Sequence, residues 1–370
     1  MSAKAVMIQG TASHAGKSVV AAALCRLYAR AGYQVAPFKA QNMSNNSFVT
    51  AEGGEMGRAQ VFQAQAAGVE PHVDMNPILL KPDADTRAQV VRLGQPVKAM
   101  DVQEYHDYQS LAWPAVTEAY DRLRSQYDLI VLEGAGSPAE INLMDRDIVN
   151  MKMAAYAGAS VILVGDIERG GVFASLVGTW QLLPPQDRER IKAFLINKFR
   201  GDASLLDTGF EFLEEQTGVP VLGVLPYVFG LPVDEEDAVV LDAGGRSGKG
   251  PLEIAVIRLP HISNATDFQP LSNEPDVSIR YLTSASDFGQ PDVVILPGTK
   301  STVADFEWMH RQGLVERVLA HHEQGGWVVG ICGGYQMMGE RVEDPDQVEA
   351  SLGIDGLSLL PVVTRFQERK

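Results

Sequence analysis

The chain has 370 residues, an apolar fraction of 45% and a formal net charge of −16 at pH 7. This length exceeds one ordinary core and predicts about two globular domains. The negative charge opposes binding to nucleic acids or anionic membranes, because the long-range field repels both. Cys25 and Cys332 provide neither a disulfide framework nor zinc-ligand spacing. With no signal peptide and no run of 18 apolar residues, we expect a cytoplasmic protein.

Short apolar runs alternate with segments of helix length, and this pattern predicts α/β domains. The runs cover residues 5–9, 129–132, 161–164, 193–196 and 219–224, which predicts a mostly parallel sheet covered by helices. An acidic and then glycine-rich stretch at 234–250 is typical of a linker. Further runs at 254–257, 293–296 and 328–331 predict a second α/β domain. We therefore place the first domain at 1–232, the linker at 233–251 and the second domain at 252–370.

Residues 10–18 lie between the first apolar run and a helix-like run at 19–30, and they are typical of a phosphate-binding loop. Small residues such as Gly16 let backbone NH groups surround phosphates, Lys17 reaches the terminal phosphate, and the Ser18 hydroxyl suits Mg²⁺. The first glycine is Gly10, and Thr11 stands where the simplest form of the motif has glycine. The segment predicts binding of a nucleoside triphosphate; the alternative is a glycine turn with a solvated lysine.

Polar side chains follow the other strands of the first domain. Glu133 ends the apolar run 129–132 and supplies a hard oxygen for Mg²⁺, unless it only caps the next helix. Asn197 follows the run 193–196 and suits a purine edge, although asparagine after a strand is usually a turn residue. The segments 38–47, 140–143 and 145–150 are rich in amides and carboxylates. In α/β proteins such loops bind ligands, and these suit a substrate with carboxylates and carboxamides unless they are merely solvated.

The second domain contains a cysteine in a glycine-flanked turn. Residues 327–336 run from an apolar strand through Cys332 to a helix start, which is the pattern of a nucleophile elbow. The amide of Gly333, and that of Gly298 in the turn at 297–301, suit an oxyanion. No histidine follows Cys332. Of the upstream candidates His310, His321 and His322, the last two precede the strand and lie roughly 15 Å or more from the thiol by strand length, so we expect surface residues.

Six segments together carry a family resemblance over essentially the full length: residues 9–18, 37–47, 133–143, 165–173, 196–202 and 296–301. They resemble the cobyric acid synthase family, the glutamine-dependent amidotransferases of cobalamin synthesis. The resemblance implies a P-loop domain with a parallel sheet, similar to dethiobiotin synthetase, that uses ATP and Mg²⁺. It also implies a class I glutamine amidotransferase domain around Cys332.

The resemblance further implies an activity and a set of site residues. ATP would phosphorylate the b, d, e and g carboxylates of a corrinoid, adenosylcobyrinic acid a,c-diamide, and ammonia from glutamine would convert them to amides. The implied assignments are Gly10, Thr11, Gly16, Lys17 and Ser18 for phosphate, Ser18 and Glu133 for Mg²⁺, Asn197 for adenine, Lys39 for the transferring phosphate, Asp147 for the substrate carboxylate, and Cys332 as nucleophile. Because no histidine follows Cys332, we expect an incomplete amidotransferase domain that amidates from free ammonia and lacks glutaminase activity.

Two other functions fit parts of the sequence. A cobyrinic acid a,c-diamide synthase has the same two-domain plan, but the polar run 41–47 favours the cobyric acid synthase family. A nucleotide-driven switch of the ParA and MinD type has a similar loop. Those switches carry a second lysine five residues before the main one, where this chain has Ala12. Their function also does not require a nucleophilic cysteine.

Overall fold

The computed structural model describes all residues except 1–2, 85–86, 229–246, 249, 350–352 and 368–370. The chain falls into two compact units, one made of Met1–Lys81 and Thr86–Glu236, the other of Asp237–Lys370 and Pro82–Asp85. Most of the predicted linker, 233–251, lies outside the described residues. None of the described helices combines the length and the apolar character needed to span a bilayer.

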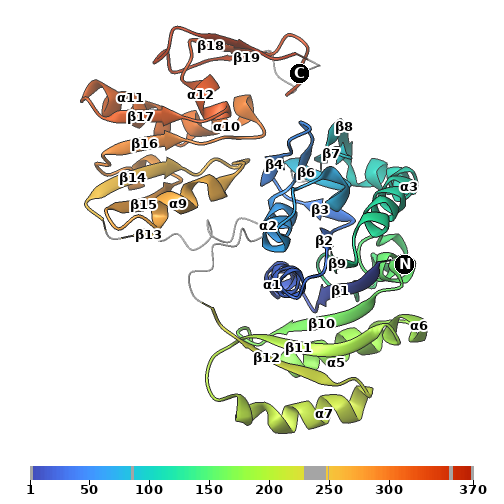
Figure 1. Ribbon diagram of the computed structural model, residues 1–370. Helices are drawn as coiled ribbons and strands as arrows, with labels where there is room; N and C mark the ends of the chain where they lie inside the picture. Colours follow the sequence, from blue (N-terminus) through green and yellow to red (C-terminus); the bar gives the residue numbers. More distant parts are fainter. Residues whose placement is uncertain (1–2, 85–86, 229–246, 249, 350–352, 368–370) are drawn as a thin grey trace. The chain divides into compact units, whose positions relative to one another are not determined.

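The first unit is built on a six-stranded sheet with the strand order β12-β11-β10-β1-β9-β2 (Figure 1). The strands are β1 (Lys4–Gly10), β2 (Val35–Phe38), β9 (Leu129–Glu133), β10 (Ser160–Asp166), β11 (Ile191–Phe199) and β12 (Val221–Pro226). All neighbouring pairs are parallel, so the predicted parallel sheet is confirmed. The carboxyl ends of β1, β9 and β11 therefore meet at one edge of the sheet.

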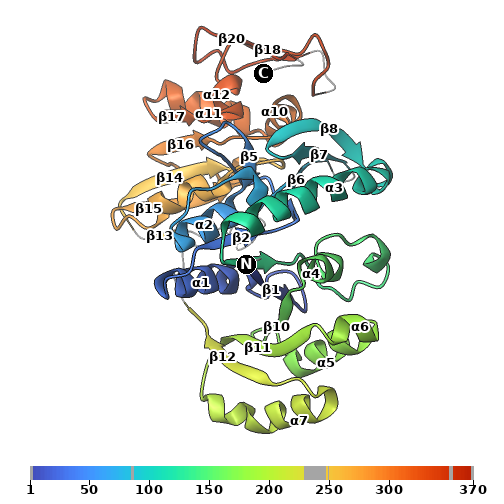
Figure 2. The same ribbon diagram turned by 45° about the vertical axis from the view of Figure 1, so that its right-hand side comes forward.

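Side chains alternate between the two faces of this sheet, and each face has its own helices. In β1, Met7 joins the larger apolar cluster and Ile8 the smaller one. Helix α1 (Lys17–Arg30) covers the smaller cluster, and α2 (Arg58–Ala67) packs against α1 and β2. The larger cluster includes residues of α3 (Val102–Gln126), α4 (Met151–Ala157), α5 (Val172–Leu182) and α7 (Asp207–Thr217). Figure 2 shows these helices from a second side. The short α6 (Pro185–Arg188) precedes β11.

Small sheets are inserted between β2 and β9, and the sequence analysis did not predict them. One has the order β3-β6-β7-β8, from β3 (Gln41–Met43), β6 (Ile78–Ala84), β7 (Arg87–Arg92) and β8 (Gln95–Asp101); β4 (Ser47–Val49) pairs with β5 (Glu55–Gly57). β3, β4 and β5 have three residues each, and polar residues interrupt β7 and β8, so these strands lack the apolar runs on which the prediction relied. β6 does begin with an apolar run, residues 78–80, which the sequence analysis did not use. Helix α3 follows directly, with a capping box in which the Glu104 amide donates to Asp101 at 2.8 Å.

The second unit contains a sheet with the order β13-β15-β14-β16-β17. Its strands are β13 (Ser247–Gly248), β14 (Leu252–Ile257), β15 (Val277–Leu282), β16 (Val293–Leu296) and β17 (Trp327–Gly330). The last four are parallel and β13 is antiparallel, so the predicted second α/β fold is confirmed. Helices α10 (Thr302–Arg311), α11 (Leu314–Glu323) and α12 (Gly333–Met337) cover one face and α9 (Gln269–Ser272) the other. The strands β18 (Arg341–Glu343), β19 (Gly353–Asp355) and β20 (Val363–Arg365) form a separate small sheet.

Candidate nucleotide site and cysteine turn

The predicted phosphate loop joins the end of β1, at Gly10, to the start of α1, at Lys17. Gly16 precedes the helix with φ 94° and ψ 23°, in the left-handed region that favours glycine. A Cβ atom on Gly16 would lie 2.0 Å from Nδ2 of Asn197, so any larger residue collides with β11. The loop therefore packs against the strand that carries Asn197, and it ends at the N-terminus of α1.

Lys17 is buried beneath this loop and held by backbone carbonyls. Its Nζ donates to the carbonyl oxygen of Ala12 at 3.0 Å and to that of Gly136 at 3.2 Å. Burial, and then the nearby charge of Lys39, lower the pKa of Lys17 to about 8, although Glu133 acts in the opposite direction. The lysine is thus a poorly solvated cation, and an anion in the loop would compensate its charge.

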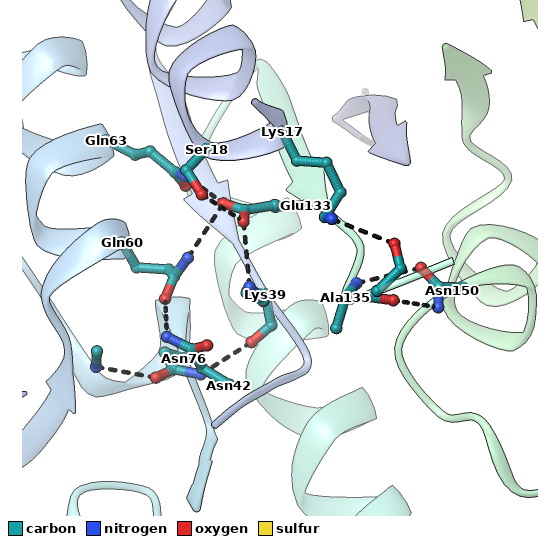
Figure 3. Close-up of polar contacts among 12 residues, drawn as sticks. Lys17, Ser18, Lys39, Asn42, Gln60, Gln63, Asn76, Glu133, Ala135 and Asn150 are labelled. Carbon is teal, nitrogen blue, oxygen red and sulfur yellow. Dashed lines mark hydrogen bonds and ion pairs between the residues drawn. The ribbon is translucent and has the colours of Figure 1, made fainter. Parts of the chain in front are cut away.

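Glu133, the last residue of β9, is the centre of the polar contacts in Figure 3. Its Oε1 accepts from Ser18 Oγ at 2.8 Å and from Lys39 Nζ at 3.1 Å. Its Oε2 accepts from Nε2 of Gln60 at 3.3 Å and from Nε2 of Gln63. Burial alone would raise the pKa of Glu133, but Lys39 and the hydrogen bonds together hold the pKa below its ordinary value. The carboxylate therefore stays ionised although it is buried.

Asn197 and Lys198 connect β11 to the other side of the loop. The amide nitrogen of Asn197 donates to the carbonyl oxygen of Ala15 at 2.9 Å. Lys198 donates to the carbonyl oxygen of His14 at 2.7 Å and pairs with Asp166 at 3.2 Å. Both residues thus hold the loop backbone, which is a contact that the sequence analysis did not foresee.

Asp147 forms hydrogen bonds with Asn150, and Asn150 holds the segment that follows β9. The Asp147 carboxylate accepts from the backbone amides of Val149 at 2.7 Å and Asn150 at 3.1 Å, and from Asn150 Nδ2 at 2.7 Å. Asn150 in turn bonds both backbone polar groups of Ala135, at 2.8 and 3.2 Å. Burial raises the pKa of Asp147 despite these hydrogen bonds. The residue also lines a small pocket whose wall includes Met144 and Lys152.

The structure thus brings Gly16, Lys17, Ser18, Lys39 and Glu133 into one site. The sequence analysis did not include Gln60 and Gln63 in it. One signal was present, since two glutamines at a spacing of three residues lie on the same face of a helix. Their partner is 70 or more residues away, however, and no local pattern identifies it.

Cys332 lies where β17 passes into α12. It is exposed and precedes the helix with φ 49° and ψ −111°, an uncommon conformation for a residue with a side chain. Gly334 lies so close to β16 that a Cβ on it would be 2.0 Å from the carbonyl oxygen of Leu296. A Cβ on Gly298 would lie 3.7 Å from that of Cys332. The predicted strand, sharp turn and helix start are confirmed, with Gly298 beside the thiol-bearing residue and Gly333 at the first helical position.

A carboxylate-paired histidine lies in the loops near this turn, and the sequence analysis did not consider it. His261 Nδ1 lies 2.7 Å from Oδ1 of the buried Asp305, whose Oδ2 accepts from Thr299 Oγ1 at 2.5 Å. Thr299 follows Gly298, and a Cβ on Gly333 would be 2.6 Å from the Thr299 methyl group. Asp305 therefore fixes both the imidazole and a side chain that packs against the cysteine turn.

Two family models together match most of the chain. A CobQ/CobB/MinD/ParA nucleotide binding domain matches residues 6–237, and a CobB/CobQ-like glutamine amidotransferase domain matches residues 253–370. The chain thus joins a P-loop nucleotide-binding domain to a glutamine amidotransferase domain.

Curated relatives define the family more closely. The chain is 54% identical to a cobyric acid synthase of Sorangium cellulosum, over 100% of this chain and 72% of the relative. It is 53% identical to cobyric acid synthases of Moorella thermoacetica, over 100% and 72%, and of Yersinia enterocolitica, over 99% and 71%. The chain therefore belongs to the cobyric acid synthase family.

Proposed function

We propose that this chain catalyses the ATP- and glutamine-dependent amidation of the b, d, e and g carboxylates of adenosylcobyrinic acid a,c-diamide, which gives cobyric acid. Its identity of 50–54% to cobyric acid synthases and its two matched domains support this reaction. The observation that carries the proposal is the convergence of Ser18, Lys39 and Glu133 beside the Gly16 loop. This arrangement suits the transfer of a phosphoryl group to a carboxylate.

In the activation step, a corrinoid carboxylate oxygen attacks the terminal phosphorus of ATP, the bond to the bridging oxygen breaks, and ADP leaves. The backbone of Gly10, Thr11 and Gly16 binds the phosphates with Lys17, whose buried charge an anion would compensate. Lys39 leaves Glu133 for the transferring phosphate. Both lysines offset negative charge that grows in the transition state.

The residues present fit a bound Mg²⁺ ion. Mg²⁺ takes oxygen ligands, usually few from the protein, together with phosphate oxygens and water. The Ser18 hydroxyl and the ionised Glu133 carboxylate lie 2.8 Å apart and provide that donor set. When bound, the ion would neutralise phosphate charge. Ser18 and Lys39 both donate to Glu133 Oε1, and these hydrogen bonds hold the three side chains in place.

Two further assignments concern adenine and the substrate carboxylate. Asn197 donates to the carbonyl oxygen of Ala15 in the loop, and this position next to the loop supports contact with adenine. Asp147 lines the pocket with Lys152, which supports contact with the substrate carboxylate. Its hydrogen bonds to Asn150 support, in addition, a role in positioning the segment after β9.

In the amidotransferase domain, the Cys332 thiolate attacks the carboxamide carbon of glutamine, the bond to nitrogen breaks, and the nitrogen takes a proton from solvent and leaves as ammonia. Water then hydrolyses the glutamyl thioester, which releases glutamate and frees the thiol. The amides of Gly298 and Gly333 stabilise the oxyanion. Ammonia then attacks the acyl phosphate carbon, and inorganic phosphate leaves. Because no histidine follows Cys332, we predict that this glutamine step is lost in the 370-residue chain and that added ammonium replaces glutamine as the nitrogen donor.

One experiment separates the candidate reactions. The protein is incubated with ATP, Mg²⁺ and either adenosylcobyrinic acid a,c-diamide or cobyrinic acid, with ammonium or glutamine as nitrogen donor, and amides are counted by mass spectrometry. We expect four new amides on the a,c-diamide with ammonium. Amidation of cobyrinic acid at two positions only would support the a,c-diamide synthase instead. ATP hydrolysis that responds to DNA or membranes and ignores corrinoids would overturn the proposal.

A further inference from the structure

Helix α2 presents two buried glutamines to the Glu133 carboxylate. Gln60 and Gln63 are both fully buried, and both donate through Nε2 to the same oxygen, Oε2. The other oxygen, Oε1, receives Ser18 and Lys39. Figure 3 shows the ends of Gln60, Gln63 and Ser18 on one side of the carboxylate and Lys39 below it. The two oxygens therefore have different partners.

The glutamines are themselves held in place. Gln60 Oε1 accepts from Asn42 Nδ2 at 3.2 Å, so both ends of its amide are used. Asn76 fixes the neighbouring backbone, since its Nδ2 donates to the carbonyl oxygens of Lys39 at 3.2 Å and Ile78 at 3.0 Å. Gln63 Oε1 is buried without a hydrogen-bond partner among the described residues. The reverse orientation would put this oxygen against the carboxylate, so Glu133 itself fixes the amide.

Neutral donors have a specific advantage at this position. A buried carboxylate needs hydrogen bonds, because an unsatisfied one costs free energy. Arginine or lysine at 60 or 63 would supply them, but would also cancel the charge that attracts a metal ion. Amides satisfy Oε2 and leave the charge of Glu133 in place. They also remain when Lys39 leaves for the transferring phosphate.

We propose that Gln60 and Gln63 are positioning residues for Glu133. Their hydrogen bonds to Oε2 fix the orientation of the carboxylate without neutralising its charge. Oε1 is thereby directed toward the metal ion of the metal–nucleotide complex. This inference rests on the proposed function, and it adds the contacts that orient a metal ligand. Partners of this kind commonly change metal affinity about 10–100-fold when they are removed.

The test measures metal binding rather than turnover. Mn²⁺ serves as a paramagnetic probe, titrated by electron paramagnetic resonance into the 370-residue protein saturated with AMP-PNP. The variants are Gln60→Met, Gln63→Met and the double substitution, because methionine keeps the length of the side chain and lacks the donor. Gln65→Met is the matched control, since Gln65 lies on the same helix and is exposed. AMP-PNP affinity in the presence of EDTA is measured in parallel.

We expect about 10-fold weaker Mn²⁺ binding for each single variant and up to about 100-fold for the double variant. Gln65→Met and the metal-free affinity for AMP-PNP should match wild type. Gln63→Lys restores a donor but adds a cation, so it should bind Mn²⁺ no better than Gln63→Met. Gln60→Met, which loses the 3.3 Å contact to Glu133 and the 3.2 Å contact from Asn42 but keeps Gln63, provides the measurement if the double variant does not fold.

Two results would overturn the inference in different ways. Wild-type Mn²⁺ affinity in Gln60→Met and Gln63→Met, with folding retained, would refute the positioning role and leave the proposed function intact. A wild-type protein whose binding of AMP-PNP shows no dependence on Mn²⁺ would overturn the metal assignment in the proposed function, and this inference with it.

Discussion

The nucleotide site of the first unit and the cysteine turn of the second are built on the same backbone plan. In each, a parallel strand ends, the chain turns sharply with positive φ at the residue before the helix, and a helix begins. Their side chains differ. Lys17, Lys39 and Glu133 are at most 3% exposed and contact or influence one another, whereas Cys332 is exposed.

Because of this difference, folding stability and reactivity depend on the same side chains in the nucleotide site, whereas at the cysteine turn they depend on different ones. A buried ion pair leaves an uncompensated charge when one partner is removed, so substitutions in the nucleotide site change both folding and reactivity. An exposed thiol contributes little to packing, so its removal changes reactivity alone. The predictions below test this contrast, from the largest expected effect to the smallest.

Glu133→Gln should reduce ammonia-driven amidation by about 10²–10³-fold, because it removes a charge that the site uses. It should also lower the free energy of unfolding by about 3–5 kcal/mol, since Lys39 is fully buried and loses its ionic partner. Urea unfolding and mass spectrometry of the corrinoid product measure the two effects. Glu70→Gln, an exposed acid of the same unit, is the control. Loss of activity with an unchanged free energy of unfolding would contradict the claim that stability and reactivity depend on the same side chains in this site.

The two thiols should differ strongly in alkylation. Burial raises the pKa of Cys25 to about 12, so about 10⁻⁴ of it is thiolate at pH 8, and it is also inaccessible. Cys332 is exposed, and iodoacetamide should modify it at least about 100-fold faster. Peptide mapping over time measures both rates. Cys332→Ala should abolish the fast phase without changing ammonia-driven amidation. Equal rates for the two cysteines would contradict the structure's assignment of burial.

The sequence predicted those parts of the sites that are contiguous in the chain. The loop at Gly16 and the turn at Cys332 are short segments whose residue types follow from their backbone geometry. Glu133 was predicted because it ends an apolar strand next to β1 in a parallel sheet. Gln63 was not, because its role depends on a partner 70 residues away. The sheets between β2 and β9 were missed for another reason. β7 and β8 form a local hairpin around residues 93–94, but polar residues interrupt both strands, so they lack the apolar runs on which the prediction relied.

Asn150→Ala should have an intermediate effect. Asn150 is 3% exposed and bonds both backbone groups of Ala135, next to the Gly136 carbonyl that accepts from Lys17. Its loss should raise the KM for ATP about 10-fold by misplacing that segment. It should also cost about 1–3 kcal/mol of stability, because the half-buried backbone groups of Ala135 lose their partners. Asn150→Asp keeps the acceptor for the Ala135 amide but sets a carboxylate against that of Asp147 and against the Ala135 carbonyl, so it should not restore the ATP affinity. An unchanged KM in Asn150→Ala would separate this segment from the nucleotide site.

The smallest expected effect is an alkaline loss of stability that originates at Cys25. Its pKa is raised from about 9 to about 12 in the folded protein, by burial first and then by the charge of Glu133. Between these values the unfolded thiol releases its proton while the folded thiol keeps it, so ionisation favours the unfolded state as pH rises. The free energy of unfolding should therefore fall by up to about 1.4 kcal/mol per pH unit above pH about 9. Urea titrations at pH 8, 9 and 10 measure this slope. Cys25→Ala should be less stable at pH 8 and show a shallower slope, whereas Cys332→Ala should keep the wild-type slope. If Cys25→Ala declined as steeply as wild type between pH 9 and 10, the alkaline loss would originate elsewhere in the chain.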